Sequence, residues 1–125
     1  MYPEADYISL TDIAKRFDSE NPSYVIQSWL RSRKTIAFLG QWERENNPNF
    51  DEQAFQQLLV DVRSPAYTLT PARWIERVNA VGIISKRGKT GGTAAHPFIA
   101  CDFEMWNDVA FRYKMVEAFI IQKVI

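Results

Sequence analysis

The sequence has little of what a disulfide framework, a metal centre or a membrane span requires. It contains one cysteine and one histidine among 125 residues, too few for an internal disulfide or a cluster of soft metal ligands. No apolar run approaches the roughly 18 residues of a membrane-spanning helix. Residues 1–6 contain no basic segment followed by an apolar one, so we expect no secretory signal.

An excess of charge of one sign is also missing, because 15 basic residues balance 15 acidic ones. The total therefore gives no indication of a nucleic-acid binder. The distribution is uneven, however: residues 12–34 and 73–95 each hold five basic residues, against three and one acidic residues. Residues 43–61 hold five acidic residues and one basic residue. If the two basic segments meet in the fold, a neutral protein gains a basic face.

The remaining composition is that of a globular protein. Hydrophobic residues make up 46% of the chain and aromatic residues 14%, which excludes intrinsic disorder. The length predicts one domain, residues 1–125, that buries roughly two-thirds of its unfolded surface. We interpret Cys101 as a small buried thiol in a reducing compartment, which favours a cytoplasmic location.

The spacing of apolar residues predicts an α+β fold that is mainly helical. Strands are expected at 7–10, 81–85 and 93–95. Helices are expected at 12–17, 22–33, 35–46, 51–62, 71–78 and 97–106, and from 108 towards the end. The expected N-terminal caps, three of which precede a proline, are Thr11, Asn21, Asp51, Thr70, His96 and Asn107.

Two features indicate nucleic-acid binding. The first two helices, joined by a turn, resemble a helix-turn-helix element, with Arg31, Arg33 and Lys34 at the exit of the second. The hairpin at 81–95 has a basic, glycine-rich tip in which Lys86, Arg87 and Lys89 supply charge. Thr90 and Thr93 add hydroxyl groups that suit phosphate oxygens. By charge pattern alone, a solvated surface loop fits the hairpin equally well.

Catalytic interpretations fail on spacing. Gly88-Lys89-Thr90 resembles the end of a phosphate-binding loop, but Ile83 stands where that motif requires glycine. We interpret His96 as a helix cap or packing residue, and Glu43 and Glu45, two apart on a helix, as solvated side chains. No set of metal-binding carboxylates followed by a lysine, as in a nuclease, is found. We expect no enzymatic activity, no cofactor, no metal and no small-molecule substrate.

A set of ordered motifs resembles a known family, the KilA-N domain. The matching stretches cover 8–17, 25–33, 35–43 and 47–50, and later 71–75, 82–86 and 91–96. Each stretch is weak alone, but their order and spacing resemble the family from about Tyr7 to Ile120. The chain departs from the family at Thr90 and Ala94, where members often carry aromatic residues.

The resemblance implies a winged helix-turn-helix-like module that binds double-stranded DNA, related to the fungal APSES domain. Many members look like phage or prophage transcriptional regulators or antirepressors. It implies that residues 12–17 and 22–33 form the helix pair, 81–95 the wing, and 35–78 an insertion. The DNA-contacting residues that we expect are Lys15, Arg16, Arg31, Arg33, Lys34, Arg73, Arg77, Lys86, Arg87, Lys89, Thr90 and Thr93.

The last helix is more apolar than one buried face requires. Its apolar residues towards the end of the chain are Val116, Phe119, Ile120, Ile121, Val124 and Ile125. This pattern predicts either a homodimer contact or continuation of the chain into a longer protein. The alternative function is therefore a protein-interaction module that binds a repressor or self-associates through this helix.

Overall fold

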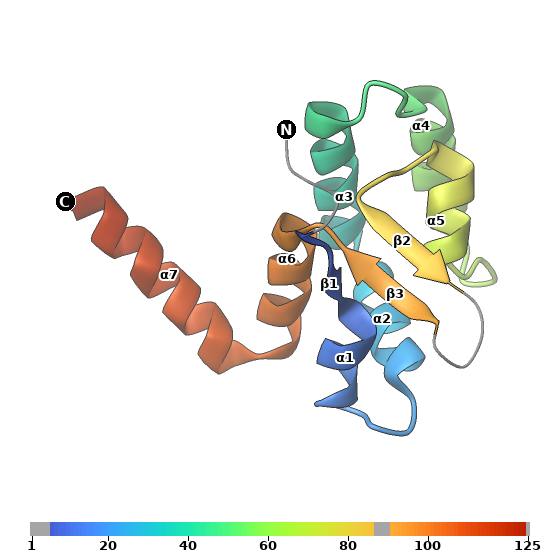
Figure 1. Ribbon diagram of the computed structural model, residues 1–125. Helices are drawn as coiled ribbons and strands as arrows, with labels where there is room; N and C mark the ends of the chain where they lie inside the picture. Colours follow the sequence, from blue (N-terminus) through green and yellow to red (C-terminus); the bar gives the residue numbers. More distant parts are fainter. Residues whose placement is uncertain (1–5, 87–90, 125) are drawn as a thin grey trace.

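The computed structural model describes residues 6–86 and 91–124, without the side chain of Val124. Within these residues the chain forms seven helices and three short strands (Figure 1). The helices are α1 (Leu10–Lys15), α2 (Pro22–Leu30), α3 (Arg33–Asn46), α4 (Glu52–Asp61), α5 (Pro71–Val78), α6 (Pro97–Asn107) and α7 (Val109–Val124). The strands are β1 (Ile8–Ser9), β2 (Ile83–Lys86) and β3 (Gly92–Ala95). The expected α+β class with mainly helical content is confirmed.

The three strands form an antiparallel sheet in the order β1-β3-β2. Ile83 and Ile8 lie opposite Ala95, and Lys86 lies opposite Gly92 at the far end of the pair. Strands β1 and β2 are shorter than predicted, because Leu10 already belongs to α1 and the chain before Ile83 makes no ladder, whereas β3 begins one residue earlier than predicted, at Gly92. Helices α1 and α6 pack against β3, and α5 packs against β2.

One hydrophobic core joins the sheet to the helices. Its largest fully buried apolar side chains include Leu10, Trp29, Leu30, Ile36, Leu39, Leu58, Trp74, Ile83, Ile99 and Phe103. Trp29 on α2 meets Phe103 on α6 edge to face, with ring centroids 4.9 Å apart. The indole N–H of Trp29 donates to the Asp102 carboxylate over 3.0 Å. This pair of contacts fixes α2 against α6.

Three of the predicted helix caps are confirmed by hydrogen bonds. Asp51, Thr70 and His96 each accept a bond from a backbone N–H in the first turn of the helix that follows. Two of the other predictions are wrong, and the third is confirmed in position only. Ser9 caps α1 in place of Thr11, and Asp108 accepts from the Phe111 N–H at the start of α7 in place of Asn107. Asn21 stands at the N-cap position of α2 but its side chain makes no capping bond.

The boundary between α2 and α3 differs from the prediction in a way that moves two basic residues. Helix α2 ends at Leu30, and α3 begins at Arg33 after Ser32. The sequence predicted that the second helix ends at residue 33 and the third begins at residue 35. This end was placed too late because no glycine or proline marks the end of α2. Arg33 and Lys34 therefore lie in the first turn of α3, not at the exit of α2, and only Arg31 remains there.

The last helix, α7, projects away from the rest of the molecule (Figure 1). It contacts α6 near their junction, and most of its later side chains are exposed. Phe98 and Trp106 on α6 are 52% and 47% exposed. Among the described residues, no helix combines the length and the apolar character needed to cross a membrane.

Candidate nucleic-acid interface

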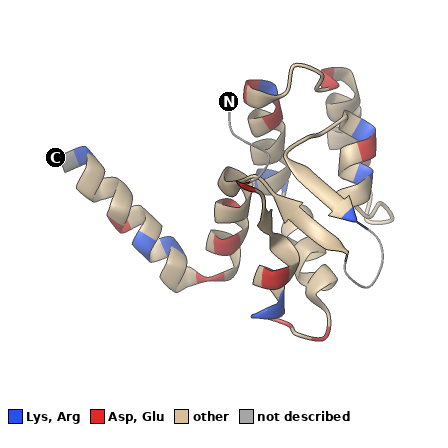
Figure 2. Ribbon diagram, viewed as in Figure 1, with Lys and Arg blue, Asp and Glu red and all other residues tan. Residues whose placement is uncertain are grey.

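Helices α1 and α2 pack against each other and are joined by a short polar turn. The Asp18 carboxylate in this turn accepts bonds from the backbone N–H groups of Glu20 and Asn21. Pro22 then opens α2 at a position where a missing N–H costs nothing. The Asp18 side chain therefore stabilises the turn, and the turn fixes the start of α2 relative to α1. Figure 2 shows acidic residues in this turn and basic residues at the end of α1.

The side of α2 that faces away from the core carries polar residues at helical spacing. Tyr24 and Arg31 are exposed and Gln27 is half-buried. The Arg31 guanidinium lies 5.7 Å from the centroid of the Tyr24 ring, a cation–π contact that orients both side chains. The sequence analysis identified Arg31 but not Tyr24 or Gln27. Their spacing of three and four residues, opposite the apolar stripe, was the signal that would have identified them.

The antiparallel pair β2–β3 is anchored directly to α1. The Thr93 backbone N–H donates to the Thr11 hydroxyl over 2.9 Å. Gly92 adopts a φ of 151°, and a Cβ added there would lie 2.8 Å from the Thr11 hydroxyl oxygen. A side chain at residue 92 would therefore strain the backbone and push the strand away from α1. Thr11, although not a cap, holds the start of β3 against the helix pair.

Two described lysines flank this junction. Lys86 is exposed at the end of β2, opposite Gly92 in the ladder. Lys15 is exposed four residues after Thr11, on the same face of α1, and lies 3.9 Å from the Asp12 carboxylate. Thr93 is buried, which does not suit a phosphate contact. The predicted contacts Arg87, Lys89 and Thr90 lie outside the described residues.

The remaining predicted contacts lie elsewhere on the molecule. Arg16 pairs with Glu104 of α6 at 3.0 Å. Lys34 lines a surface hollow between α3, α6 and α7, together with Asp102 and Arg112. Arg33 is exposed in the same first turn of α3. The structure therefore does not gather Arg31, Arg33 and Lys34 into one patch at a helix exit.

Arg73 and Arg77 of α5 come together around Tyr67. Both guanidinium groups lie within 5.8 Å of the centroid of its ring. Arg77 also pairs with Asp61 at 2.7 Å, and Arg73 donates to the Thr68 carbonyl. Hydrogen bonds from Gln57 and Arg77 lower the pKa of Asp61, so this carboxylate stays ionised and offsets the charge of Arg77.

Glu43, interpreted from the sequence as a solvated side chain, is fully buried. One carboxylate oxygen accepts bonds from the Val81 N–H at 3.0 Å and the Asn47 amide at 2.8 Å. The other accepts from the Gly82 N–H at 2.8 Å. A Cβ at Gly82 would lie 2.8 Å from two carbons of the buried Trp42 ring and 2.6 Å from Ile99 Cδ1, so a side chain at this position would force the packing to shift. Glu43 thus ties α3 to the chain segment that leads into β2.

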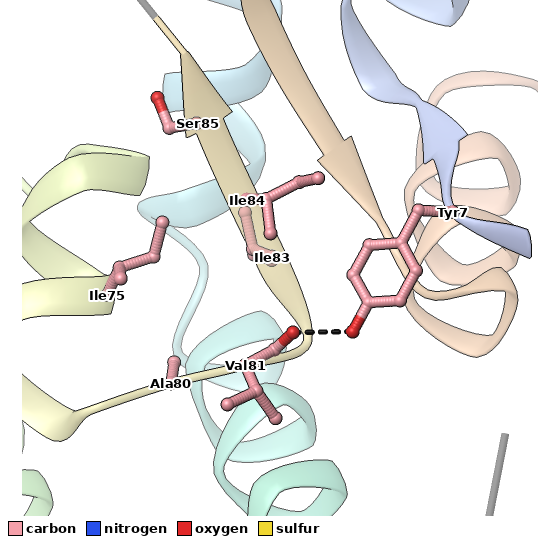
Figure 3. A pocket seen from close by; sticks show the side chains of 7 residues that line it. All are labelled: Tyr7, Ile75, Ala80, Val81, Ile83, Ile84 and Ser85. Carbon is pink, nitrogen blue, oxygen red and sulfur yellow. Dashed lines mark hydrogen bonds between the residues drawn. The ribbon is translucent and has the colours of Figure 1, made fainter. Parts of the chain in front are cut away.

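A surface cavity of about 400 Å³ lies beside this segment (Figure 3). Its lining is Tyr7, Ile75, Ala80, Val81, Ile83, Ile84 and Ser85. The Tyr7 hydroxyl donates to the Val81 carbonyl at its edge. Among the described residues, no charged side chain lines this cavity, and we do not include it in a phosphate-binding surface.

The single histidine and the single cysteine do not form a reactive site. Burial lowers the pKa of His96, whose Nδ1 accepts from the Phe98 N–H as a neutral ring would. Cys101 is half-buried, not fully buried as expected, and burial raises the pKa of its thiol, which disfavours the reactive thiolate. Within the described part of the chain, no group of three side chains has the geometry of a metal site.

Comparison with known proteins identifies a family. The chain matches the family model described as the KilA-N domain over residues 1–123, nearly its whole length. This is the family that the ordered sequence motifs resemble, and that prediction is confirmed. No curated protein and no solved structure matches the chain.

Proposed function

This chain belongs to the KilA-N domain family of DNA-binding domains, and from that premise we propose that it binds double-stranded DNA as a winged helix-turn-helix module. In this proposal α1 and α2 are the helix pair and β2–β3 is the wing. The observation that carries the proposal is the bond between Thr11 and Thr93, because it couples the wing to the helix pair. The protein would act as a phage- or prophage-type transcriptional regulator or antirepressor in the cytoplasm, without catalytic activity.

Helix α2 is the proposed recognition element. Tyr24, Gln27 and Arg31 supply the side chains that direct readout of the major groove requires. Arginine forms paired hydrogen bonds with guanine, and glutamine does so with adenine. The stacking of Arg31 on Tyr24 would hold the guanidinium ready for such a contact.

The wing and the end of α1 supply the proposed phosphate contacts. Lys86 and Lys15 lie on either side of the α1–β3 junction, and Arg87, Lys89 and Thr90 remain predicted contacts from the sequence. Arg33, Lys34, Arg73, Arg77 and Arg16 would extend the footprint, with Arg16 and Arg77 already partly neutralised by acidic partners. We leave the buried Thr93 hydroxyl out of the proposed surface.

The first test is fluorescence anisotropy of a labelled random-sequence duplex, titrated with the protein at several salt concentrations. A DNA-binding surface with several phosphate contacts loses affinity steeply as salt rises. Binding with a steep negative slope of log K against log salt is the expected result. No binding at low salt would overturn the proposal.

Lys86→Ala is expected to weaken binding to all sequences alike and to reduce the salt slope by about 0.9, because one phosphate contact is lost. Lys89→Ala is expected to do the same. Lys114→Ala on α7 is the matched control, since this lysine is also exposed but lies on the helix that projects away from the wing. An unchanged slope for Lys86→Ala would remove that residue from the interface.

Gln27→Ala is expected to relax sequence preference more than it weakens nonspecific binding. A bidentate contact to a base discriminates by about 1–3 kcal/mol, whereas a phosphate contact carries no sequence information. The measurement is selection of preferred sites from a random pool with both proteins, followed by competition binding. Ser23→Ala, an exposed neighbour outside the Tyr24–Gln27–Arg31 row, serves as the control. Identical selected sites would exclude Gln27 from base readout.

A protein-interaction module is the second candidate function, and the exposed apolar residues of α7 favour it. In that case the helix would bind a repressor or a second copy of the chain, and the basic hairpin would have no role. Salt distinguishes the two functions, because a largely apolar protein contact shows little of the salt dependence of phosphate contacts.

A further inference from the structure

The exposed side of α7 carries a regular apolar seam. Val109, Tyr113, Val116 and Ile120 are spaced by four, three and four residues, which is the alternation of the d and a positions of a heptad repeat. Their side chains are 82%, 70%, 50% and 52% exposed. An apolar seam of this kind is the surface by which one helix packs against another.

The seam is not used within the chain. The α7 side chains that are half-buried near α6 are Phe111 and Met115, which occupy the f and c positions of the same repeat. These positions lie on the opposite side of the helix from a and d. The later part of the seam, Tyr113, Val116 and Ile120, is therefore open to a second helix, whereas Val109 and Arg112 at the start of α7 also line the hollow between α3, α6 and α7.

Charge on the flanks of the seam identifies the partner. Arg112 occupies a g position and Glu117 the e position five residues later. In a parallel two-stranded coiled coil, a g residue faces the e residue five positions ahead on the other helix, so each Arg112 would meet the Glu117 of a second copy. In an antiparallel pair, g faces g, and Arg112 would meet Phe119 instead. The pairing of Arg112 with Glu117 arises only in the parallel arrangement.

We propose that α7 pairs in parallel and in register with α7 of a second copy of this chain, through the Val109–Tyr113–Val116–Ile120 seam. The next d position is Lys123, so the apolar seam ends at Ile120. The Lys123 ammonium lies over the Phe119 ring of its own chain, 5.3 Å from the ring centroid. The two bodies would lie on opposite flanks of the short coil and at the same end of it. If the proposed DNA-binding function holds, this two-fold arrangement presents two wings to a palindromic site.

The test is sedimentation velocity of the full chain, without DNA, over a wide range of protein concentrations. The unmodified chain is expected to show a concentration-dependent monomer–dimer equilibrium, and Val116→Asp is expected to weaken the dimer by at least about tenfold, because it places a charge in each copy of the seam. Val60→Asp is the matched control, since Val60 on α4 is 51% exposed and lies outside the seam. A monomer at every concentration, or a dimer that Val116→Asp does not weaken, would overturn the proposal.

Two further variants test the parallel register. Arg112→Glu and Glu117→Arg should each weaken the dimer, and the double variant should restore it, whereas Lys114→Glu should have little effect. In a chain with Cys101→Ser, Val116→Cys should form a disulfide-linked dimer on oxidation, because identical d positions face each other only in a parallel pair. A seam-dependent dimer without this cross-link would overturn the parallel arrangement. These readouts contain no DNA, so their failure is distinct from failure of the DNA-binding proposal.

Discussion

Glu43→Ala is expected to lower the free energy of unfolding by about 3–4 kcal/mol, because it leaves three hydrogen-bond donors without their acceptor. Two of these donors, the Val81 and Gly82 N–H groups, belong to the backbone just before β2. The third is the Asn47 amide, which also donates to the Asn79 carbonyl. The measurement is urea denaturation followed by circular dichroism.

The neighbouring Glu45 provides the control for this prediction. It is exposed, and its carboxylate accepts one bond from Gln41. Glu45→Ala is expected to change the free energy of unfolding by less than about 0.5 kcal/mol. Glu43→Gln keeps one oxygen acceptor, so its free energy of unfolding should lie between those of Glu43→Ala and Glu45→Ala. Equal stabilities for Glu43→Ala and Glu45→Ala would show that the buried carboxylate does not hold α3 to β2.

The pH dependence of the same variants gives an independent signature. Burial raises the pKa of Glu43 above its ordinary value of 4.5. Between 4.5 and the raised pKa, the folded chain retains a proton that the unfolded chain has lost, so stability falls as pH rises through this window. The stability advantage of the unmodified chain over Glu43→Gln should therefore be largest below pH 4.5 and smaller at neutral pH. An advantage that grows as pH rises would contradict a raised pKa.

Glu43 also shows where local sequence reasoning stops. On α3, residue 43 follows the core residue Trp42 and precedes the exposed Arg44. Its place on the helix is therefore compatible with a buried side chain and with an exposed one. What decides its burial is the return of the chain at Val81 and Gly82, about forty residues later, with backbone N–H groups that need an acceptor. A carboxylate is tolerated in such a place only when its hydrogen bonds are satisfied. No pattern within α3 carries that information.

The helix starts marked by a capping side chain were predicted well, whereas the end of α2 was not, for a physical reason. Asp51, Thr70 and His96 cap from the side chain, and two of them precede a proline, so each start is encoded locally. The end of α2 has no such signal, since Arg31 closes it in an ordinary helical conformation. The predicted cluster of Arg31, Arg33 and Lys34 depended on that end, and the structure places its members on two different helices.

The proposed contact surface was only partly predictable from charge. Lys15 and Lys86 were identified because they are basic, but what places them at one junction is the Thr11 hydroxyl, which the sequence suggested only as a cap. Tyr24 and Gln27 carry no charge and were overlooked. The spacing of apolar residues supplied the order of the elements and the resemblance to the family supplied their expected roles, whereas the contacts that join the hairpin to the helix pair required the structure.

Trp29→Ala is expected to have the largest effect of any substitution considered, lowering the free energy of unfolding by about 3–5 kcal/mol. Trp29 is fully buried on α2, and removing its ring opens a cavity against Phe103. The change also removes the indole N–H that donates to Asp102. Thermal and urea denaturation would measure the loss, and Trp106→Ala is the control, because that ring is 47% exposed on α6. A similar loss for both variants would contradict the role of Trp29 in the core.

Trp29→Phe separates the hydrogen bond from the packing and links the core to the proposed function. It retains an aromatic ring against Phe103 but leaves the Asp102 oxygen without this donor, at an expected cost of about 1–3 kcal/mol. Trp29 lies on the buried side of α2, opposite Tyr24, Gln27 and Arg31. Weaker packing of α2 against the core should therefore reduce the selectivity of DNA binding, while the wing lysines stay in place. The expected result is a lower ratio of specific to nonspecific affinity with an unchanged salt slope. A reduced slope with unchanged selectivity would show instead that α2 is not the element that reads the DNA sequence.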